Sequence, residues 1–223
     1  MIQLEHISKT YEKRGSTVHA LADVSFHVPK GGFLAITGPS GSGKTTLMNI
    51  LGCLDRPDSG LYRLDGQTVE QLGGAAAADL RNRKIGFVFQ SFNLIGSMSA
   101  LENVELPLVL RGISRKERRQ TALEALERVG LASRALHRPA ELSGGQQQRV
   151  AIARVLAADP SLILADEPTG NLDGPTARDI LSVLDGLHRE GRTIVMITHD
   201  PVVAAAAPRS LRMENGRLTT QNH

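Results

Sequence analysis

Apolar and polar positions alternate along this chain in two ways, and each predicts its own kind of sheet. Short runs rich in apolar and β-branched residues, at 33–37, 161–165 and 193–198, are separated by longer amphipathic stretches. Buried strands that alternate with helices are typical of a mainly parallel α/β sheet. In the first residues, by contrast, Ile2 and Leu4 alternate with polar residues. This period of two predicts an antiparallel sheet beside the parallel one.

Helical signals dominate the middle of the chain. Ser99 and Ser114 each stand three residues before a glutamate, which is the spacing at which a serine side chain caps the first turn of a helix. A further helix is expected to start after Ser143. Near the end of the chain, Asn215-Gly216 between two short alternating runs predicts a β-hairpin.

The composition narrows the class of protein. The 223 residues include five Phe, two Tyr and no Trp, too few rings for a platform that stacks single-stranded nucleic acid. A formal charge of +3 does not indicate nucleic-acid binding either, so we expect no nucleic-acid partner. A single cysteine, Cys53, excludes an internal disulfide and suits a reducing compartment. The longest apolar run, 202–207, is far below the roughly 20 residues that span a bilayer, so we expect a soluble, cytoplasmic chain.

A glycine-rich segment follows the first buried strand. Its sequence, Gly38-Pro39-Ser40-Gly41-Ser42-Gly43-Lys44-Thr45, matches the P-loop pattern of two glycines five residues apart followed by Lys and Ser or Thr. The backbone N–H groups of such a loop converge on a phosphate at the N-terminus of the next helix. Lys44 is expected to reach the β- and γ-phosphates, and the Thr45 hydroxyl to hold Mg²⁺. The dinucleotide-binding fingerprint is excluded, because Thr46 stands where its third glycine belongs.

Two carboxylates end the second buried strand. Asp166 and Glu167 follow Leu162-Ile-Leu-Ala, at the C-terminal edge where open α/β sheets place their sites. We expect Asp166 to reach Mg²⁺ through water, and Glu167 to face the γ-phosphate and an attacking water. Carboxylates at a strand end are common surface features, and the phosphate loop in the same chain is what favours a nucleotide site.

The segment Leu142-Ser143-Gly144-Gly145-Gln146, followed by Gln-Gln-Arg149, resembles the signature of the ATP-binding-cassette (ABC) ATPases. Physically it is a second helix N-terminus able to bind a γ-phosphate, in a chain that already has one phosphate loop. The resemblance implies a head-to-tail dimer of two copies. In that dimer Ser143, Gly144, Gly145 and Gln146 of each copy close over the ATP of the other.

Further positions match the family in chain order, and their roles rest on that resemblance. Tyr11 resembles the aromatic residue that stacks on adenine. Gln90 resembles the glutamine that contacts Mg²⁺ and the attacking water and senses the membrane partner. Asp173, in Gly170-Asn-Leu-Asp173, resembles part of the segment that crosses the dimer interface, although many members carry Ser-Ala before Leu-Asp. His199 resembles the switch histidine at the γ-phosphate.

The resemblance implies hydrolysis of ATP by water and a complete set of site residues. The implied catalytic residues are Glu167 as general base, His199, Gln90 and Lys44. The implied ATP-binding residues are Tyr11, Gly38, Pro39, Ser40, Gly41, Ser42, Gly43, Lys44, Thr45, Thr46, Gln90 and Asp166. The implied Mg²⁺ ligands, partly through water, are Thr45, Gln90 and Asp166.

The resemblance also implies the fold. It is the α/β core of the P-loop (RecA-like) NTPases, with an antiparallel β subdomain and an inserted α-helical subdomain. We expect residues 1–223 to form a single ATPase domain. Its nucleotide-binding core and β subdomain would lie in 1–90 and 155–223, and its helical signature subdomain in 91–154.

Three segments, 51–57, 81–94 and 102–107, resemble the macrolide-export and lipoprotein-release branch of the family. Members of that branch serve four-span transmembrane permease subunits with a large extracytoplasmic domain. Such partners would hold the chain at the inner face of the cell membrane. The ATPase of a cell-division regulator, with a similar membrane partner, is the alternative that the sequence hardly separates. A P-loop kinase fits less well, because it needs neither the signature peptide nor the switch histidine.

Overall fold

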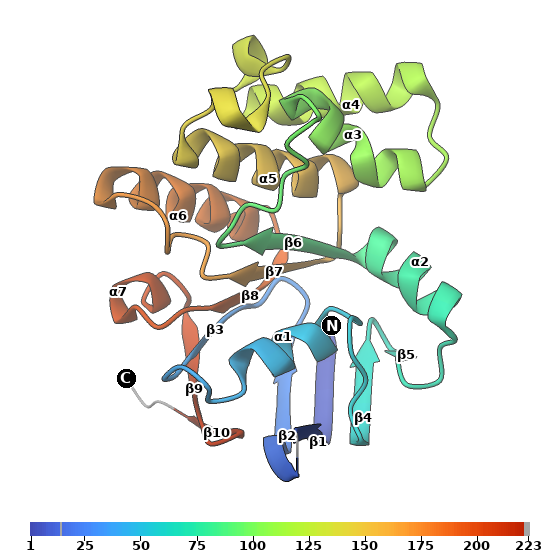
Figure 1. The fold of residues 1–223 in the computed structure, drawn as a ribbon, viewed down its shortest axis with the longest axis vertical. Coiled ribbons are helices and arrows are strands. Elements are labelled where there is room, and N and C mark those ends of the chain that lie inside the picture. Colours follow the sequence, from blue (N-terminus) through green and yellow to red (C-terminus); the bar gives the residue numbers. More distant parts are fainter. Residues whose placement is uncertain (14, 221–223) are drawn as a thin grey trace. The chain divides into compact units, whose positions relative to one another are not determined.

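The computed structural model describes residues 1–13 and 15–220 (Figure 1). The chain divides into two compact units. The first unit combines Met1–Arg81 with His188–His223, and the second unit is Asn82–Leu187. Each unit contains strands and helices of its own.

The first unit contains the antiparallel sheet that the N-terminal alternation predicts. Its strands, in the order β2-β1-β4-β5, are β1 (Ile2–Lys13), β2 (Ser16–Val28), β4 (Ser59–Leu64) and β5 (Gln67–Thr68). In the register, Ile2 is paired with Val28 on one side and with Leu64 on the other. All three of these side chains are buried, which confirms that the apolar half of each alternation faces the core.

Parallel strands complete the first unit. β3 (Phe33–Thr37) pairs in parallel with both β8 (Thr193–Ile197) and β9 (Arg209–Glu214), and all five residues of β8 are buried. β10 (Arg217–Thr220) forms the predicted hairpin with β9. Its turn residues Asn215 and Gly216 both have positive φ angles, 47° and 75°, as a tight hairpin turn requires.

One buried tyrosine connects the antiparallel sheet to a helix of the same unit. Helix α1 (Lys44–Leu51) follows β3, and the fully buried Tyr62 of β4 donates its hydroxyl to the main-chain oxygen of Leu51 at 2.8 Å. Burial raises the pKa of Tyr62, so this hydroxyl stays protonated and remains a donor. The C-terminal end of α1 is therefore fixed by the sheet. A second helix of this unit, α7 (Pro201–Ala204), contacts β3.

The second unit is mostly helical around two parallel strands. β6 (Ile85–Phe89) pairs with β7 (Leu162–Asp166) from Ile85 opposite Leu162 to Phe89 opposite Asp166. The helices are α3 (Ala100–Leu110), α4 (Arg115–Arg128), α5 (Gly144–Ala158) and α6 (Gly174–Arg189), the last as far as Leu187. Two short 3₁₀ turns, η1 (Ala132–Arg134) and η2 (Pro139–Glu141), precede α5. α5 packs on α3, on α4 and on β6.

All three predicted helix starts are confirmed. The side chains of Ser99, Ser114 and Ser143 accept hydrogen bonds from backbone N–H groups three residues further on. Helix α2 (Gly74–Lys84), in contrast, has no apolar stripe, since only Leu80 is buried. It therefore gave no periodic signal in the sequence. It lies in the first unit as far as Arg81.

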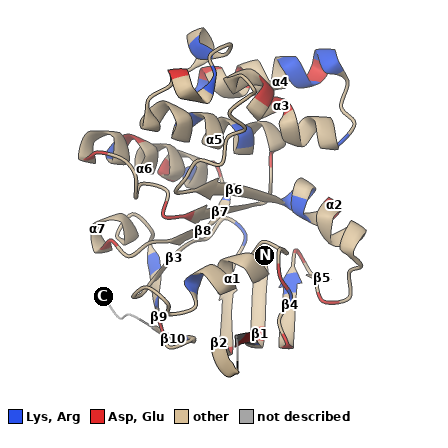
Figure 2. Ribbon diagram, viewed as in Figure 1, with Lys and Arg blue, Asp and Glu red and all other residues tan. Residues whose placement is uncertain are grey.

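Basic residues gather at the start of α4, with Glu117 among them (Figure 2). Arg115, Lys116 and Arg119 are exposed. Arg118 reaches Glu105 of α3 at 3.4 Å, and both side chains are mostly buried. This pair therefore joins α4 to α3, while the exposed basic residues face solvent.

A buried asparagine shapes the loop between β6 and α3. Asn103 is fully buried, and its side-chain amide donates to the main-chain oxygens of Ile95, Met98 and Ser99 at 3.0–3.3 Å. Its Oδ1 accepts the N–H of Ile95 at 2.7 Å. One side chain thus satisfies four main-chain groups of a segment that has no ladder of its own.

We expect Asn103→Ala to lower the free energy of unfolding by about 3 kcal/mol, because it removes all the side-chain hydrogen bonds of Asn103 to this segment, including the acceptor of the Ile95 N–H. Urea denaturation followed by circular dichroism measures the change. Gln120→Ala on the exposed face of α4 is the matched control and should stay within about 0.5 kcal/mol of the parent. Equal stability of the two variants would contradict this account of Asn103.

Candidate active site

The glycine-rich loop of the first unit closes over its lysine. Lys44 is buried, and its ammonium group donates to the main-chain oxygens of Gly38 at 2.8 Å and Pro39 at 2.7 Å. α1 begins at this residue, with Gly43 as its N-cap. The lysine charge and the N-terminus of α1 are thus gathered at one point. This is an arrangement that suits a phosphate group.

Two glycines of the loop lie where no side chain would fit. A Cβ atom at Gly38 would come within 2.2 Å of the main-chain oxygen of Met213 in β9, and one at Gly43 within 2.3 Å of that of Ala20 in β2. Both residues also have positive φ angles, 149° and 107°. The loop passes so closely between two strands that only glycine fits at these two positions. This requirement is independent of ligand binding.

The loop shares a pocket with the predicted switch histidine. His199 lies two residues after the end of β8 and is exposed. It lines a pocket of about 390 Å³ together with Gly38, Pro39, Ser210 and Arg212. The structure therefore brings His199 to the start of the phosphate loop, within one unit of the chain.

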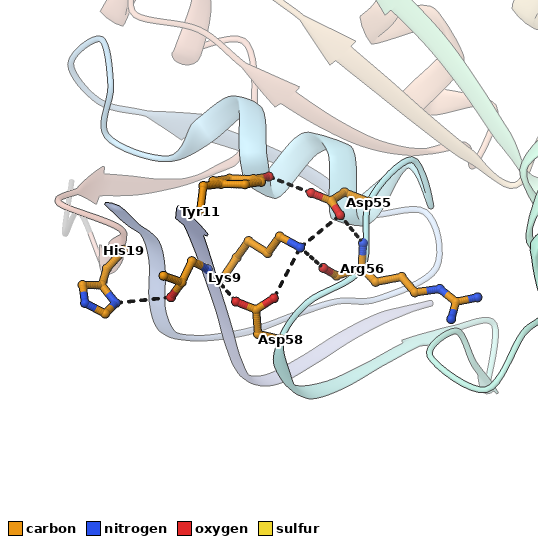
Figure 3. Close-up of polar contacts among 7 residues, drawn as sticks. Lys9, Tyr11, His19, Asp55, Arg56 and Asp58 are labelled. Carbon is orange, nitrogen blue, oxygen red and sulfur yellow. Dashed lines mark hydrogen bonds and ion pairs between the residues drawn. The ribbon is translucent and has the colours of Figure 1, made fainter. Parts of the chain in front are cut away.

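Tyr11 of β1 lies beside α1 and is held by a polar network (Figure 3). Its ring is 37% exposed, and its hydroxyl donates to Oδ2 of Asp55 at 2.6 Å. The Lys9 ammonium group donates to Oδ1 of Asp55 at 3.1 Å and lies 3.4 Å from Oδ1 of Asp58 and 5.3 Å from the centroid of the Tyr11 ring. The network fixes the ring while one part of it remains open to a ligand.

Asp55 is the centre of this network. Its burial opposes ionisation, but hydrogen bonds from the Tyr11 hydroxyl, the Arg56 N–H and the Lys9 ammonium outweigh burial and lower its pKa. Asp55 therefore stays charged at neutral pH. Tyr11 was predicted from the sequence, but Asp55 and Lys9 were not, because they lie far apart in the chain and are brought together only by the fold.

The carboxyl ends of β6 and β7 form one edge of the second unit. Phe89 pairs with Asp166, so Gln90 and Glu167 each directly follow a paired strand end at this edge. Glu167 has a positive φ of 45°, a conformation that costs a non-glycine residue about 1–2 kcal/mol. Its main-chain oxygen accepts the N–H of Gly170 at 3.0 Å, which closes a turn directly after the strand.

The predicted Mg²⁺ ligands fit that ion chemically. Mg²⁺ prefers oxygen ligands and is usually bound through one or two carboxylates together with substrate phosphates. Thr45 contributes a hydroxyl from α1, Asp166 a carboxylate at the end of β7, and Gln90 an amide oxygen. All three are oxygen donors.

The signature segment forms the N-terminus of α5. Ser143 is its N-cap, and Gln146 completes the capping box by accepting the Ser143 N–H at 3.0 Å. A Cβ atom at Gly145 would lie 2.3 Å from Cγ2 of Thr176, so α6 approaches α5 too closely for any other residue. Asp173, from the predicted interface segment, accepts the Thr176 N–H at 2.8 Å and thus caps α6.

Arg154 of α5 is a residue of this region that the sequence analysis left without a role. Its guanidinium donates to the main-chain oxygens of Asn93 at 2.7 Å and Phe92 at 3.2 Å. Phe92 and Asn93 both have positive φ angles, 59° and 49°. Arg154 therefore fixes the strained segment that follows Gln90. The sequence offered no signal for this, because the contact spans 61 residues.

A strand that leads through a glycine loop with a buried lysine into a helix, and a second strand that ends in two carboxylates, are typical of P-loop nucleotide-binding proteins. Comparison with known proteins identifies the family. Residues 21–170 match the family model described as ABC transporter. The chain belongs to the ABC transporter family, as an ATP-binding subunit that hydrolyses ATP.

Two relatives illustrate the range of the matches. The uncharacterized ABC transporter ATP-binding protein YvrO of Bacillus subtilis is 53% identical over 218 residues, which cover 98% of this chain and 95% of YvrO. The macrolide export ATP-binding/permease protein MacB 1/2 of Paracoccus denitrificans is 49% identical over 218 residues. The chain spans only 33% of the length of that protein.

A solved structure confirms the predicted fold. The ATP-binding cassette MJ0796, in a dimeric post-hydrolysis state bound to ADP and Pi, has a TM-score of 0.91 and 43% sequence identity. The match covers 100% of both chains. The α/β core with an antiparallel sheet and helical parts is thus the cassette fold. Among the residues that the structure describes, no helix has the length and apolar character needed to cross a membrane.

The lowered pKa of Asp55 leads to a prediction with a definite sign. We expect Asp55→Asn to lower the free energy of unfolding by about 1–2 kcal/mol at pH 7, since the amide replaces a charged acceptor. A carboxyl group whose pKa is lower in the folded state stabilises the protein at pH values above its unfolded pKa, about 3.9 for Asp. This stabilisation is lost as the pH falls below that value. The gap between parent and variant should therefore shrink below about pH 4.

Urea denaturation at a series of pH values between 7 and 3.5 measures this gap. Asp23→Asn serves as the control, because the His6–Asp23 pair is exposed (80% and 60% for the two side chains) and should contribute little. A gap that stays constant down to pH 3.5 would contradict the charged state of Asp55 as its cause.

Proposed function

We propose that this chain powers membrane permease subunits of the macrolide-export or lipoprotein-release type. The observation that carries the proposal is the 49% identity with a third of MacB, whose name joins an ATP-binding part to a permease. The similarity to YvrO, which the chain covers over 95% of its length, supports an ATP-binding subunit on a chain of its own. Through such permeases the subunit would lie at the cytoplasmic face of the cell membrane.

The proposed reaction is in-line attack of water on the γ-phosphate of ATP. Lys44 exchanges its bonds to the loop oxygens for bonds to phosphate oxygens and, with the N–H groups of the loop, stabilises the charge that develops. Glu167 accepts the proton of the attacking water, and His199 positions the phosphate. Bound Mg²⁺, held by Thr45, Gln90 and Asp166, would neutralise phosphate charge.

Two copies of the chain are proposed to enclose two ATP molecules. The dimeric state of the ADP- and Pi-bound neighbour supports this arrangement. The N-terminus of α5, with Ser143 and the two glycines after it, would contact the nucleotide held by the second copy. Asp173 would lie in the segment that crosses the interface between the copies.

Glu167→Gln tests the chemistry and the dimer together. The substitution keeps the shape of the side chain but removes the proton acceptor, so we expect ATP binding to survive while turnover falls about 100-fold or more. It also removes negative charge beside the γ-phosphate, so the ATP-bound dimer should accumulate. Gel filtration with and without Mg·ATP should show a shift from monomer to dimer that requires the nucleotide.

Glu127→Gln, on the exposed face of α4, is the control and should match the parent in turnover and in elution. Hydrolysis at the parent rate by Glu167→Gln would exclude Glu167 as the general base. Loss of hydrolysis without dimer formation would keep the base but reject an ATP-induced dimer of the isolated subunit.

The membrane partner is proposed to bind the segment 91–99. This segment carries Phe92, Leu94, Ile95 and Met98, and Ile95 is 38% exposed. Asn103 and Arg154 hold its main chain from α3 and α5, so its shape is fixed by hydrogen bonds rather than by burial of its own side chains. A rigid, partly apolar segment suits a short amphipathic helix of a permease.

Ile95→Asp should abolish co-purification with the permease and the ATPase stimulation by it, since a charge would replace an apolar contact, while basal ATPase stays within twofold of the parent. The measurement uses the chain co-expressed with its permease subunit. Leu136→Asp, at a leucine of the same unit that is 74% exposed, controls for the added charge. Normal stimulation of Ile95→Asp, or loss in both variants, would reject segment 91–99 as the docking site.

A further inference from the structure

We propose that Asn171 is a positioning residue, which turns the side-chain amide of Gln90 so that its oxygen stays available to Mg²⁺. This inference rests on the proposed role of Gln90 as a Mg²⁺ ligand. Asn171 lies in the predicted interface segment, three residues after Pro168, and has no role in the residue assignments above. Both residues belong to the second unit.

Two hydrogen bonds join these residues in opposite directions. Nδ2 of Asn171 donates to the main-chain oxygen of Gln90 at 3.0 Å, and Nε2 of Gln90 donates to Oδ1 of Asn171 at 3.2 Å. The spacing along the chain is 81 residues, so the pair links the end of β6 to the turn after β7.

The order of donors and acceptors fixes the orientation of both amides. A main-chain oxygen can only accept, so Asn171 must present its NH₂ group to it. The Oδ1 of Asn171 then faces Gln90 and can only accept in turn, so Gln90 must present its NH₂ group. The remaining atom of the Gln90 amide is the oxygen, Oε1. An amide binds a hard cation through its oxygen, so Asn171 selects the useful orientation.

Gly170 provides the room for this pair. A Cβ atom at Gly170 would lie 2.7 Å from Nε2 of Gln90 and 3.1 Å from its Cδ. Any side chain at this position would therefore displace the Gln90 amide. The φ angle of Gly170 is not positive, so its backbone conformation does not require glycine. The close approach of the Gln90 side chain does.

The same two positions are those at which the chain departs from Ser-Ala, the pair found in many ABC ATPases. Serine at 170 would bring its Cβ against Gln90, and alanine at 171 could not hydrogen bond to it. The two residues therefore act together. Gly170 leaves space for the Gln90 amide, and Asn171 orients it.

The turn that carries Asn171 is itself fixed at both ends. The N–H of Gly170 donates to the main-chain oxygen of Glu167 at 3.0 Å. Gln148 of α5 is fully buried and donates its amide to the main-chain oxygen of Pro168 at 2.5 Å. Leu172 contacts the position of Gly144, at 3.6 Å from a Cβ built there. Asn171 therefore extends from a rigid turn that connects the proposed base to the signature helix.

The test compares binding of the non-hydrolysable analogue AMP-PNP with Mg²⁺ and with EDTA, by titration calorimetry. In EDTA, Asn171→Ala should bind AMP-PNP within twofold of the parent, because the phosphate loop is unchanged. The gain in affinity that Mg²⁺ provides should fall about tenfold, as is typical when a partner that orients a metal ligand is removed. In steady-state hydrolysis kcat should fall by a similar factor, with KM for ATP within twofold.

A double-mutant cycle separates the inference from the proposed function. Gln90→Ala should lose the same Mg²⁺-dependent gain, and adding Asn171→Ala to it should cost nothing further, because Asn171 acts only through Gln90. Gly170→Ala, which displaces Gln90 with Asn171 intact, should reproduce the loss. Glu127→Gln, on the exposed face of α4 and outside every proposed site, is the control and should match the parent.

Three outcomes would overturn the inference. Unchanged Mg²⁺ gain and kcat in Asn171→Ala would show that the orientation of Gln90 does not depend on it. Additive losses in the double mutant would show that Asn171 acts elsewhere, while the proposed function stands. An unchanged Mg²⁺ gain in Gln90→Ala would remove the proposed role of Gln90 and the inference with it.

Discussion

The closure of a tight backbone loop over one buried ammonium group is the constraint on which the first unit depends. Lys44 takes two loop carbonyls as partners, and the loop reaches them only because glycines let it pass against β2 and β9. The strands on both sides therefore help to shape the phosphate loop, because their main-chain oxygens lie against Gly38 and Gly43. Tyr62 fixes the far end of α1 to the antiparallel sheet, so the helix that starts at Lys44 is held at both ends.

In the second unit, side chains hold short irregular segments that make no hydrogen bonds of a regular helix or sheet. Asn103, Arg154 and Gln148 each use buried or half-buried side-chain donors to satisfy main-chain oxygens in the loops after β6 and β7. Polar residues that are costly to bury are tolerated here because each one is hydrogen-bonded to a fixed loop. The segments proposed to contact the permease and the second copy are thus rigid in shape, although they lie outside regular elements.

In the proposal, the rigid turn with Gly170 and Asn171 controls which atom of the Gln90 amide is available to Mg²⁺. Amide groups look alike in shape but differ in which end donates, so a site that needs an oxygen ligand must control that choice. A main-chain carbonyl, which cannot reverse its polarity, provides the reference from which the orientation of Asn171 and then of Gln90 follows. The proposal links Gln90, the proposed interface segment and the signature helix through contacts within the second unit.

The sequence by itself determined the strands, the three serine-capped helices, the phosphate loop and the family, because these depend on neighbours within a few residues. Spacing of glycines, capping pairs and alternation of apolar residues are local signals, and the structure confirms them. Helix α2 has no apolar face to bury and so escaped detection. The roles of Asp55, Asn103, Arg154 and Asn171 were decided only by the tertiary structure. Each of them acts on main chain or side chains that the fold brings close, in most cases from dozens of residues away, and no local pattern encodes such a contact.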